Sequence, residues 1–213
     1  MDHPHAKGLV LMPPPKGAHG FDLVIQGKAV PVQRFYRTGS ILDQGQKPMC
    51  GGYAAYQLLQ SEPIPQKVST PEGIYRKART LDGLPKGTEG TTIAGVVAAL
   101  RAMKAVDNSY VAYSVDHVFK YVATISPVLI GSEWTTKMDT PSGDGRIRST
   151  GDNTGGHAYL CHGVDFETKR LYFTNSWGKS WGNDGTCWMT FADFTKLFNR
   201  SGSAAAVREI RND

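Results

Sequence analysis

Apolar residues recur at helical spacing in three segments of the first half of the chain. The run 50–60 has no breaker after its two glycines and carries an apolar stripe, which predicts a helix whose N-terminus lies at or near a cysteine. Residues 71–78 follow two good N-cap residues, Ser69 and Thr70, and predict a second helix. Residues 91–105 show the helical period again and predict a third helix with a buried face.

The second half of the chain changes to short apolar runs separated by turn residues, which predicts strands. Because the helices come first and the strands second, we expect an α+β fold with a helical lobe and a sheet lobe, rather than alternating units on a parallel sheet. The predicted strands cover residues 128–130, 157–164, 171–173 and 187–189.

Residues 1–34 are expected to form an N-terminal arm, rich in Pro and Gly, with one strand-like patch at 21–25. Its apolar stretch 9–12 is too short for a signal peptide and runs directly into Pro13–Pro15. No later segment approaches the length of a membrane span, so we expect no membrane partner. The expected location is the cytoplasm, or a destination reached by export or packaging without a Sec signal.

Length and composition narrow the class of protein without naming a function. A chain of 213 residues can bury a core without disulfides, and 40% hydrophobic residues exclude a disordered class. The net charge of +5 is spread along the chain rather than gathered into basic runs. With no zinc-finger spacing and no basic helix, we expect no nucleic-acid partner.

The cysteines are Cys50, Cys161 and Cys187, so at least one thiol is unpaired, which is typical of a reducing compartment. Cys161 and Cys187 lie on predicted neighbouring strands; pairing stays open, and reduced core thiols are favoured. Along its strand Cys161 points to the same side as His157, whereas His162 points to the other, so no metal site is predicted.

A thiol is a strong nucleophile only as thiolate, and a helix N-terminus and a nearby imidazolium both lower its pKa. Cys50, at the start of the first predicted helix, has the first of these features. His157 is the candidate for the second, because small neighbours at the start of its strand leave the ring accessible. Each signal alone fits a structural residue equally well.

Three motifs together resemble the papain-like cysteine peptidases, over roughly residues 35–200. They occur in the order found in that family: Asp-Gln-Gly-Gln-Lys-Pro-Met-Cys-Gly-Gly-Tyr-Ala at 43–54, Gly-Gly-His-Ala at 155–158, and Asn-Ser-Trp-Gly-Lys-Ser-Trp-Gly-Asn-Asp-Gly at 175–185. The resemblance is to the shorter, disulfide-free members of bacterial or phage type. It implies that residues 35–213 form a two-lobed papain-like catalytic domain, with a helical left lobe over about 35–107, a β-barrel-like right lobe over about 108–213, and the active-site cleft between them.

The resemblance also implies a reaction, the hydrolysis of peptide bonds through an acyl-enzyme, with a protein or peptide as substrate. Cys50 would be the nucleophile, His157 the general base and acid, and Asn175 the residue that orients the histidine. Gln44 and the Cys50 N–H would form the oxyanion hole. No cofactor or metal is implied, and we expect a monomer. Substrate contacts are expected at Gly90, Gly156 and Trp177.

The chain departs from the family at Gly51, where an aromatic is usual, and at Lys47, where secreted relatives have a bridging cysteine. The separations between the motifs are shorter than the roughly 130 to 150 residues typical of the family, so trimmed loops are expected. Two alternatives stay open: isopeptidase or transferase chemistry on the same residues, and a catalytically silent binding module. The arm either crosses the lobes as a structural element, which is favoured, or approaches the cleft as a gate.

Overall fold

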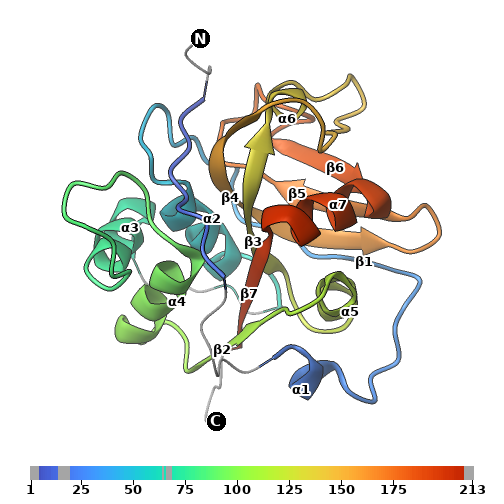
Figure 1. Cartoon of the computed structure of the whole chain (residues 1–213). Helices are drawn as coiled ribbons and strands as arrows, with labels where there is room; N and C mark the ends of the chain where they lie inside the picture. Colours follow the sequence, from blue (N-terminus) through green and yellow to red (C-terminus); the bar gives the residue numbers. More distant parts are fainter. Residues whose placement is uncertain (1–4, 14–19, 64, 66–68, 209–213) are drawn as a thin grey trace.

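The computed structural model describes residues 5–13, 20–63, 65 and 69–208. Helices α2 (Cys50–Leu59), α3 (Pro71–Arg79) and α4 (Ile93–Ala102) group on one side of the molecule, and an antiparallel sheet lies on the other (Figure 1). Two hydrophobic clusters correspond to these two bodies. The predicted α+β class is therefore confirmed.

The three predicted helices form where their local signals place them. Thr70 caps α3 by accepting from the Gly73 N–H, and Thr92 caps α4 by accepting from the Gly95 N–H. The α4 helix is shorter than the predicted 91–105. At its start, Thr91 precedes the helix and Thr92 is the N-cap. None of the helices in the described part of the chain is long and apolar enough to cross a membrane.

The sheet is antiparallel throughout, with the order β2-β7-β3-β4-β5-β6 and β1 paired to β4. Within the described residues the end strands β2 and β6 do not pair with each other, so the sheet is open and the expected barrel-like form applies only loosely. The strands are β1 Gln33–Phe35, β2 Asn108–Val111, β3 Val128–Thr135, β4 Asn153–Asp165, β5 Arg170–Thr174, β6 Thr186–Thr190 and β7 Ser203–Arg208.

Several elements differ from the sequence predictions. The strand predicted at 21–25 is wrong: Asp22–Ile25 form the short helix α1. Its neighbour Phe21 is fully buried against the ring of Tyr121, with centroids 4.2 Å apart, so one aromatic anchors this segment rather than strand pairing. Helices α5 (Val115–Thr124) and α7 (Phe191–Ser201) lie in the half of the chain for which only strands were predicted.

Each hydrophobic cluster also takes in a residue of the predicted arm. The cluster under α2, α3 and α4 includes Leu9 and extends to Ala158 and Leu160 of β4. The cluster between the sheet, α5 and α7 includes Phe21. The lobe boundary near residue 107 and the arm as a separate unit stay predictions.

The cysteines are unpaired and buried. Cys161 on β4 pairs with Phe173 on β5, and Phe173 pairs with Cys187 on β6, so the prediction that the two cysteines lie on neighbouring strands is wrong. Strands two places apart are separated by roughly 10 Å. A disulfide bridges Cα atoms only up to about 7 Å apart, so these thiols stay reduced.

We therefore expect the same melting temperature with and without reductant. The measurement is thermal unfolding followed by circular dichroism in matched buffers, with intact mass confirming three free thiols. A clear drop in melting temperature under reduction would contradict the reduced state of the two sheet cysteines.

Candidate active site

Cys50 is the first residue of α2 and is fully buried where this helix packs on β4. The backbone N–H of Ala158, on β4, faces its sulfur, as do the N–H groups of Cys50 itself and Gly51. The N-cap residue Met49 provides no side-chain acceptor for the first turn. The positive end of the helix dipole is thus directed at the sulfur.

The residue before Ala158 is His157, whose imidazole is fixed from one side. Its Nε2 lies 2.8 Å from Oδ1 of Asn175, and that oxygen also accepts from the Ser176 N–H at 2.8 Å. Since the amide oxygen can only accept, Nε2 carries the proton and Nδ1 is the basic nitrogen. Nδ1 is buried and has no hydrogen-bond partner among the described residues, so it is free to accept a proton.

Two tryptophans enclose the histidine. The ring of Trp177 lies 4.6 Å from the imidazole and that of Trp134 lies 4.7 Å from it, edge to face. Burial lowers the pKa of His157 to about 3, against the opposing effect of the Asn175 hydrogen bond. Burial also raises the pKa of Cys50 to about 11. The pair is therefore neutral in this arrangement.

Gln44 lies beside the same residues, and each end of its side-chain amide is engaged. Its Oε1 accepts from Ser176 Oγ at 2.6 Å, and its Nε2 donates to the Lys47 carbonyl at 2.8 Å. The second Nε2 hydrogen is directed at the carbonyl oxygen of Ala6, 3.2 Å away. The amide is thus oriented by the residue next to Asn175 and binds a peptide carbonyl of the arm.

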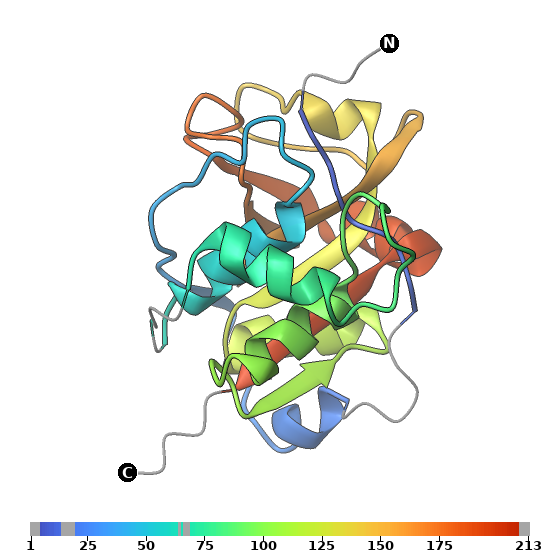
Figure 2. The ribbon, with the colours of Figure 1, turned by 90° about the vertical axis from the view of Figure 1, so that its left-hand side faces the viewer.

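The arm runs between the two bodies, which Figure 1 shows as the dark blue segment descending past α2 and β4. Leu9 donates its N–H to the Gly156 carbonyl at 3.1 Å, and Val10 donates to the Thr91 carbonyl at 2.8 Å. Thr91 in turn donates to the Gly8 carbonyl at 2.9 Å. The arm is therefore an extended segment paired on both of its edges, and Figure 2 shows it passing the loop that leads into α4.

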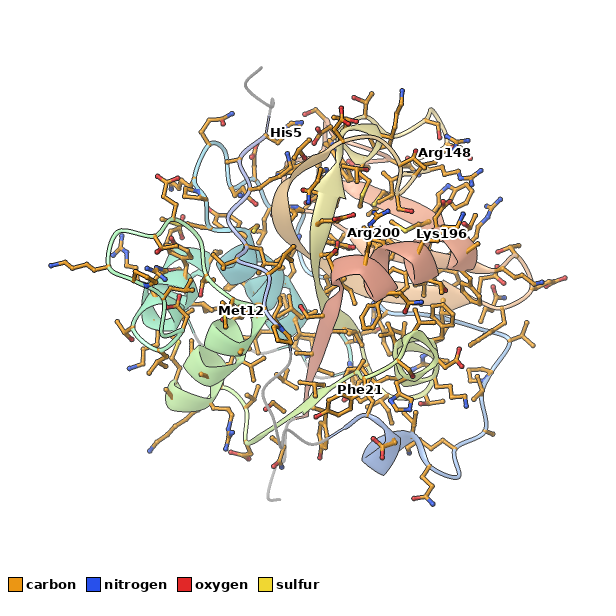
Figure 3. All side chains as sticks on the ribbon, in the orientation of Figure 1. His5, Met12, Phe21, Arg148, Lys196 and Arg200 are labelled. Atoms are coloured by element: carbon orange, nitrogen blue, oxygen red, sulfur yellow. The ribbon has the colours of Figure 1, made fainter. Side chains whose placement is uncertain are left out.

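Most of the predicted site residues lie next to this arm. His5, at the upper end of the arm in Figure 3, stacks on Trp177 with ring centroids 4.3 Å apart. The Gly8 N–H points at the Cys50 sulfur. A side chain would not fit at the two predicted glycines: a Cβ at Gly90 would lie 2.3 Å from the Gly8 oxygen, and one at Gly156 would lie 2.1 Å from the Leu9 oxygen.

Gln57 is a site residue that the sequence reasoning missed. It is buried in α2, seven residues after Cys50, and its Nε2 donates to the Asn175 carbonyl at 3.1 Å. This hydrogen bond connects α2, which carries Cys50, to the segment that carries Asn175. A spacing of seven places both side chains on one helix face, so a polar residue there was a usable signal. Trp134 and Ser176 were also missed.

The departure at Gly51 does not leave the helix start loosely packed. Gly51 is buried, and a Cβ there would lie 3.0 Å from Cγ2 of both Thr91 and Val96. Thr91, just before α4, and Val96 within it therefore pack directly against Gly51. In the described part of the chain, no three His, Cys, Asp or Glu side chains gather in a way that could hold a metal ion.

No protein-family model matches this chain, and no curated protein matches it by sequence. Solved structures match its fold: xylellain, a cysteine protease from Xylella fastidiosa, is 19% identical, with 97% of each chain covered and a TM-score of 0.79. The chain has the papain-like fold. Procathepsin L 3 of Tenebrio molitor is 13% identical over 89% of this chain and 73% of its own, with a TM-score of 0.68.

A third papain-like structure is bromelain from Ananas comosus, solved with a bound inhibitor. It is 14% identical over 85% of this chain and 100% of its own, with a TM-score of 0.62. The resemblance seen in the three motifs is thus confirmed for the fold. At these identities the likeness concerns the fold.

Because burial raises the Cys50 pKa to about 11, we expect slow alkylation of Cys50 by iodoacetamide at pH 7 and a rate that rises steadily towards pH 10. The thiolate is the reacting form, and its fraction grows about tenfold per pH unit below the pKa. Peptide mapping by mass spectrometry measures the rate, while circular dichroism checks that the protein stays folded. A rate already high and constant from pH 5 would instead indicate a thiolate–imidazolium pair beneath the arm.

Proposed function

We propose that this chain is a cysteine peptidase whose cleft is closed by its own N-terminal arm. The observation that supports this most directly is the arm itself: an extended peptide lies over Cys50 with one carbonyl on the Gln44 amide and its backbone paired to Gly156 and Thr91. A groove that pairs with a peptide backbone on both edges is suited to protein or peptide substrates.

In the proposed reaction, His157 Nδ1 takes the proton of the Cys50 thiol, and the sulfur attacks the carbonyl carbon of the scissile bond. The developing oxyanion accepts from the Gln44 amide and the Cys50 N–H, donors worth roughly 3 kcal/mol each in comparable sites. His157 then gives its proton to the leaving amine, which departs and leaves a thioester. A water activated by the same nitrogen hydrolyses the thioester and regenerates the thiol.

The neighbouring residues act on this pair by position. Asn175 fixes the histidine tautomer, and Gln57 fixes the Asn175 backbone relative to α2. Trp177 and Trp134 exclude water from the Asn–His hydrogen bond, which strengthens it. This preserved set of contacts favours an active enzyme over a silent binding module.

The arm acts in this proposal as a gate rather than as plain structure. It covers the sulfur, and its removal would readmit water to Cys50 and His157. Hydration weakens the desolvation that raises the pKa of the Cys50 thiol and lowers the pKa of the His157 imidazole. The thiolate–imidazolium pair then becomes accessible near neutral pH. The stretch after Pro13, with Pro14 and Pro15, lies outside the described residues.

The substitution Gly8→Ala tests the gate without altering the catalytic residues. A Cβ at Gly8 would lie 2.0 Å from the Pro48 carbonyl oxygen, so the arm cannot dock unchanged. We expect at least about tenfold faster labelling of Cys50 by a peptidyl epoxide, the equivalent of about 1.4 kcal/mol of lost docking. Gly143→Ala is the matched control, because no atom lies within 4 Å of a Cβ built there. A lower melting temperature without faster labelling would show that the arm is plain structure.

In the Gly8→Ala background, Cys50→Ala should abolish peptide turnover, by roughly 10⁴-fold or more, while the melting temperature stays close to that of the parent. Asn175→Ala should cost less, on the order of 10²-fold, because Asn175 orients the histidine and makes no bond. Cys187→Ala, the same chemical change away from the cleft, should keep the turnover of whatever protein remains folded. Turnover that survives Cys50→Ala would refute the assignment of the nucleophile.

A further inference from the structure

The side chain of Lys7 is buried in the cleft, although lysine is almost never fully buried unless paired. Only 8% of it is exposed, and its Nζ lies 3.3 Å from Oδ1 of Asp139, whose side chain is also 8% exposed. Lys7 stands between Ala6, which binds the Gln44 amide, and Gly8, which faces the sulfur. Its side chain therefore leaves the bound peptide beside the reacting atoms.

Asp139 is held by indole groups. It is the last residue of α6 (Thr136–Asp139), and its Oδ1 accepts from Trp134 Nε1 at 3.0 Å. Its backbone carbonyl accepts from Trp181 Nε1 at 2.9 Å. The carboxylate is thus fixed in orientation by Trp134, whose ring also packs against His157.

The rest of the pocket suits a long cationic side chain. The Lys7 ammonium lies 5.6 Å from the ring centroid of Trp177, within cation–π range. Gly155 lies beside the stem, where a Cβ would lie 3.6 Å from the Lys7 Cδ. Within the described residues Lys7 Nζ makes no hydrogen bond, so charge and the aromatic face, rather than a directed bond, hold the side chain.

We propose that this pocket is a subsite for a lysine or arginine adjoining the cleavage point, with Asp139 as the specificity-determining residue and Lys7 as its built-in occupant. The inference rests on the proposed peptidase function. When the arm leaves, the Asp139 carboxylate loses the ammonium of Lys7, and breaking a pair in which both side chains are so little exposed is unfavourable. A basic substrate side chain restores the pair. The arm shows that an extended peptide with one carbonyl on the Gln44 amide can place the side chain of the next residue in this pocket.

The test uses the full chain with Lys7→Met, which removes the charge and keeps an unbranched stem. Matched peptidyl epoxides carry either lysine or norleucine next to the warhead, on each side in turn, and mass spectrometry follows the labelling of Cys50. We expect the lysine probe to react at least about tenfold faster on one side. Asp139→Asn, which still accepts from Trp134, should remove this preference, and Asp139→Lys should reverse it.

Asp144→Asn is the matched control, because Asp144 is exposed and bonds to Ser142 and Arg146 in a nearby turn. The Asp144→Asn variant should keep the preference for the lysine probe. If the preference disappears in this variant, a general charge effect explains it and the subsite is overturned. Equal rates for the two probes on Lys7→Met would also overturn the subsite while leaving the peptidase intact.

A binding measurement separates the two hypotheses. If no probe labels Cys50, the proposed function fails. Fluorescence anisotropy of the matched lysine and norleucine peptides on Lys7→Met then still reports on the pocket. Tighter binding of the lysine peptide that disappears in Asp139→Asn supports the subsite, and equal binding overturns it.

Discussion

The packing of α2 on β4 is the contact on which the rest of the site depends. One body contributes the sulfur and the other the imidazole, and in the proposed reaction these two groups must be placed to within about 0.5 Å. Small residues let the elements approach: Ala54 on the helix and Ala158 on the strand share one buried cluster with Cys50. Gln57 adds a hydrogen bond between the bodies, so the helix cannot slide along the strand without breaking it.

The same closeness explains the electrostatics of the closed cleft. A sulfur and an imidazole removed from water both favour their neutral forms, and the N–H groups around Cys50 offset this only in part. The N–H donors around Cys50 are already in place. Formation of the charged pair therefore requires the entry of water and little rearrangement of the protein. Such preorganisation, with polar groups directed in advance at a developing charge, is usually the largest contribution to catalysis.

Features with local signals could be predicted from the sequence. The helix starting at Cys50, the threonine caps of α3 and α4 and the central strands follow from propensity and period. Apolar residues recur at helical spacing in the sequences of α5 and α7, for example Phe194, Leu197 and Phe198 in α7. These segments were missed because they lie between residues that predict strands. The path of the arm was out of reach, because backbone bonds to Thr91 and Gly156 fix it and these carry no sequence signature.

The two ends of the arm pack in different parts of the fold. Phe21 is buried among α5 and the sheet, whereas residues 5–10 lie between the two bodies, so the segment that covers Cys50 belongs to the same chain as its binding site. The binding of such a segment is intramolecular and does not depend on the protein concentration. Any inhibitor or substrate added to the intact chain competes with it. Its apparent dissociation constant is the intrinsic one divided by the fraction of molecules with an empty cleft, so affinities measured on intact and on arm-displaced protein describe different quantities.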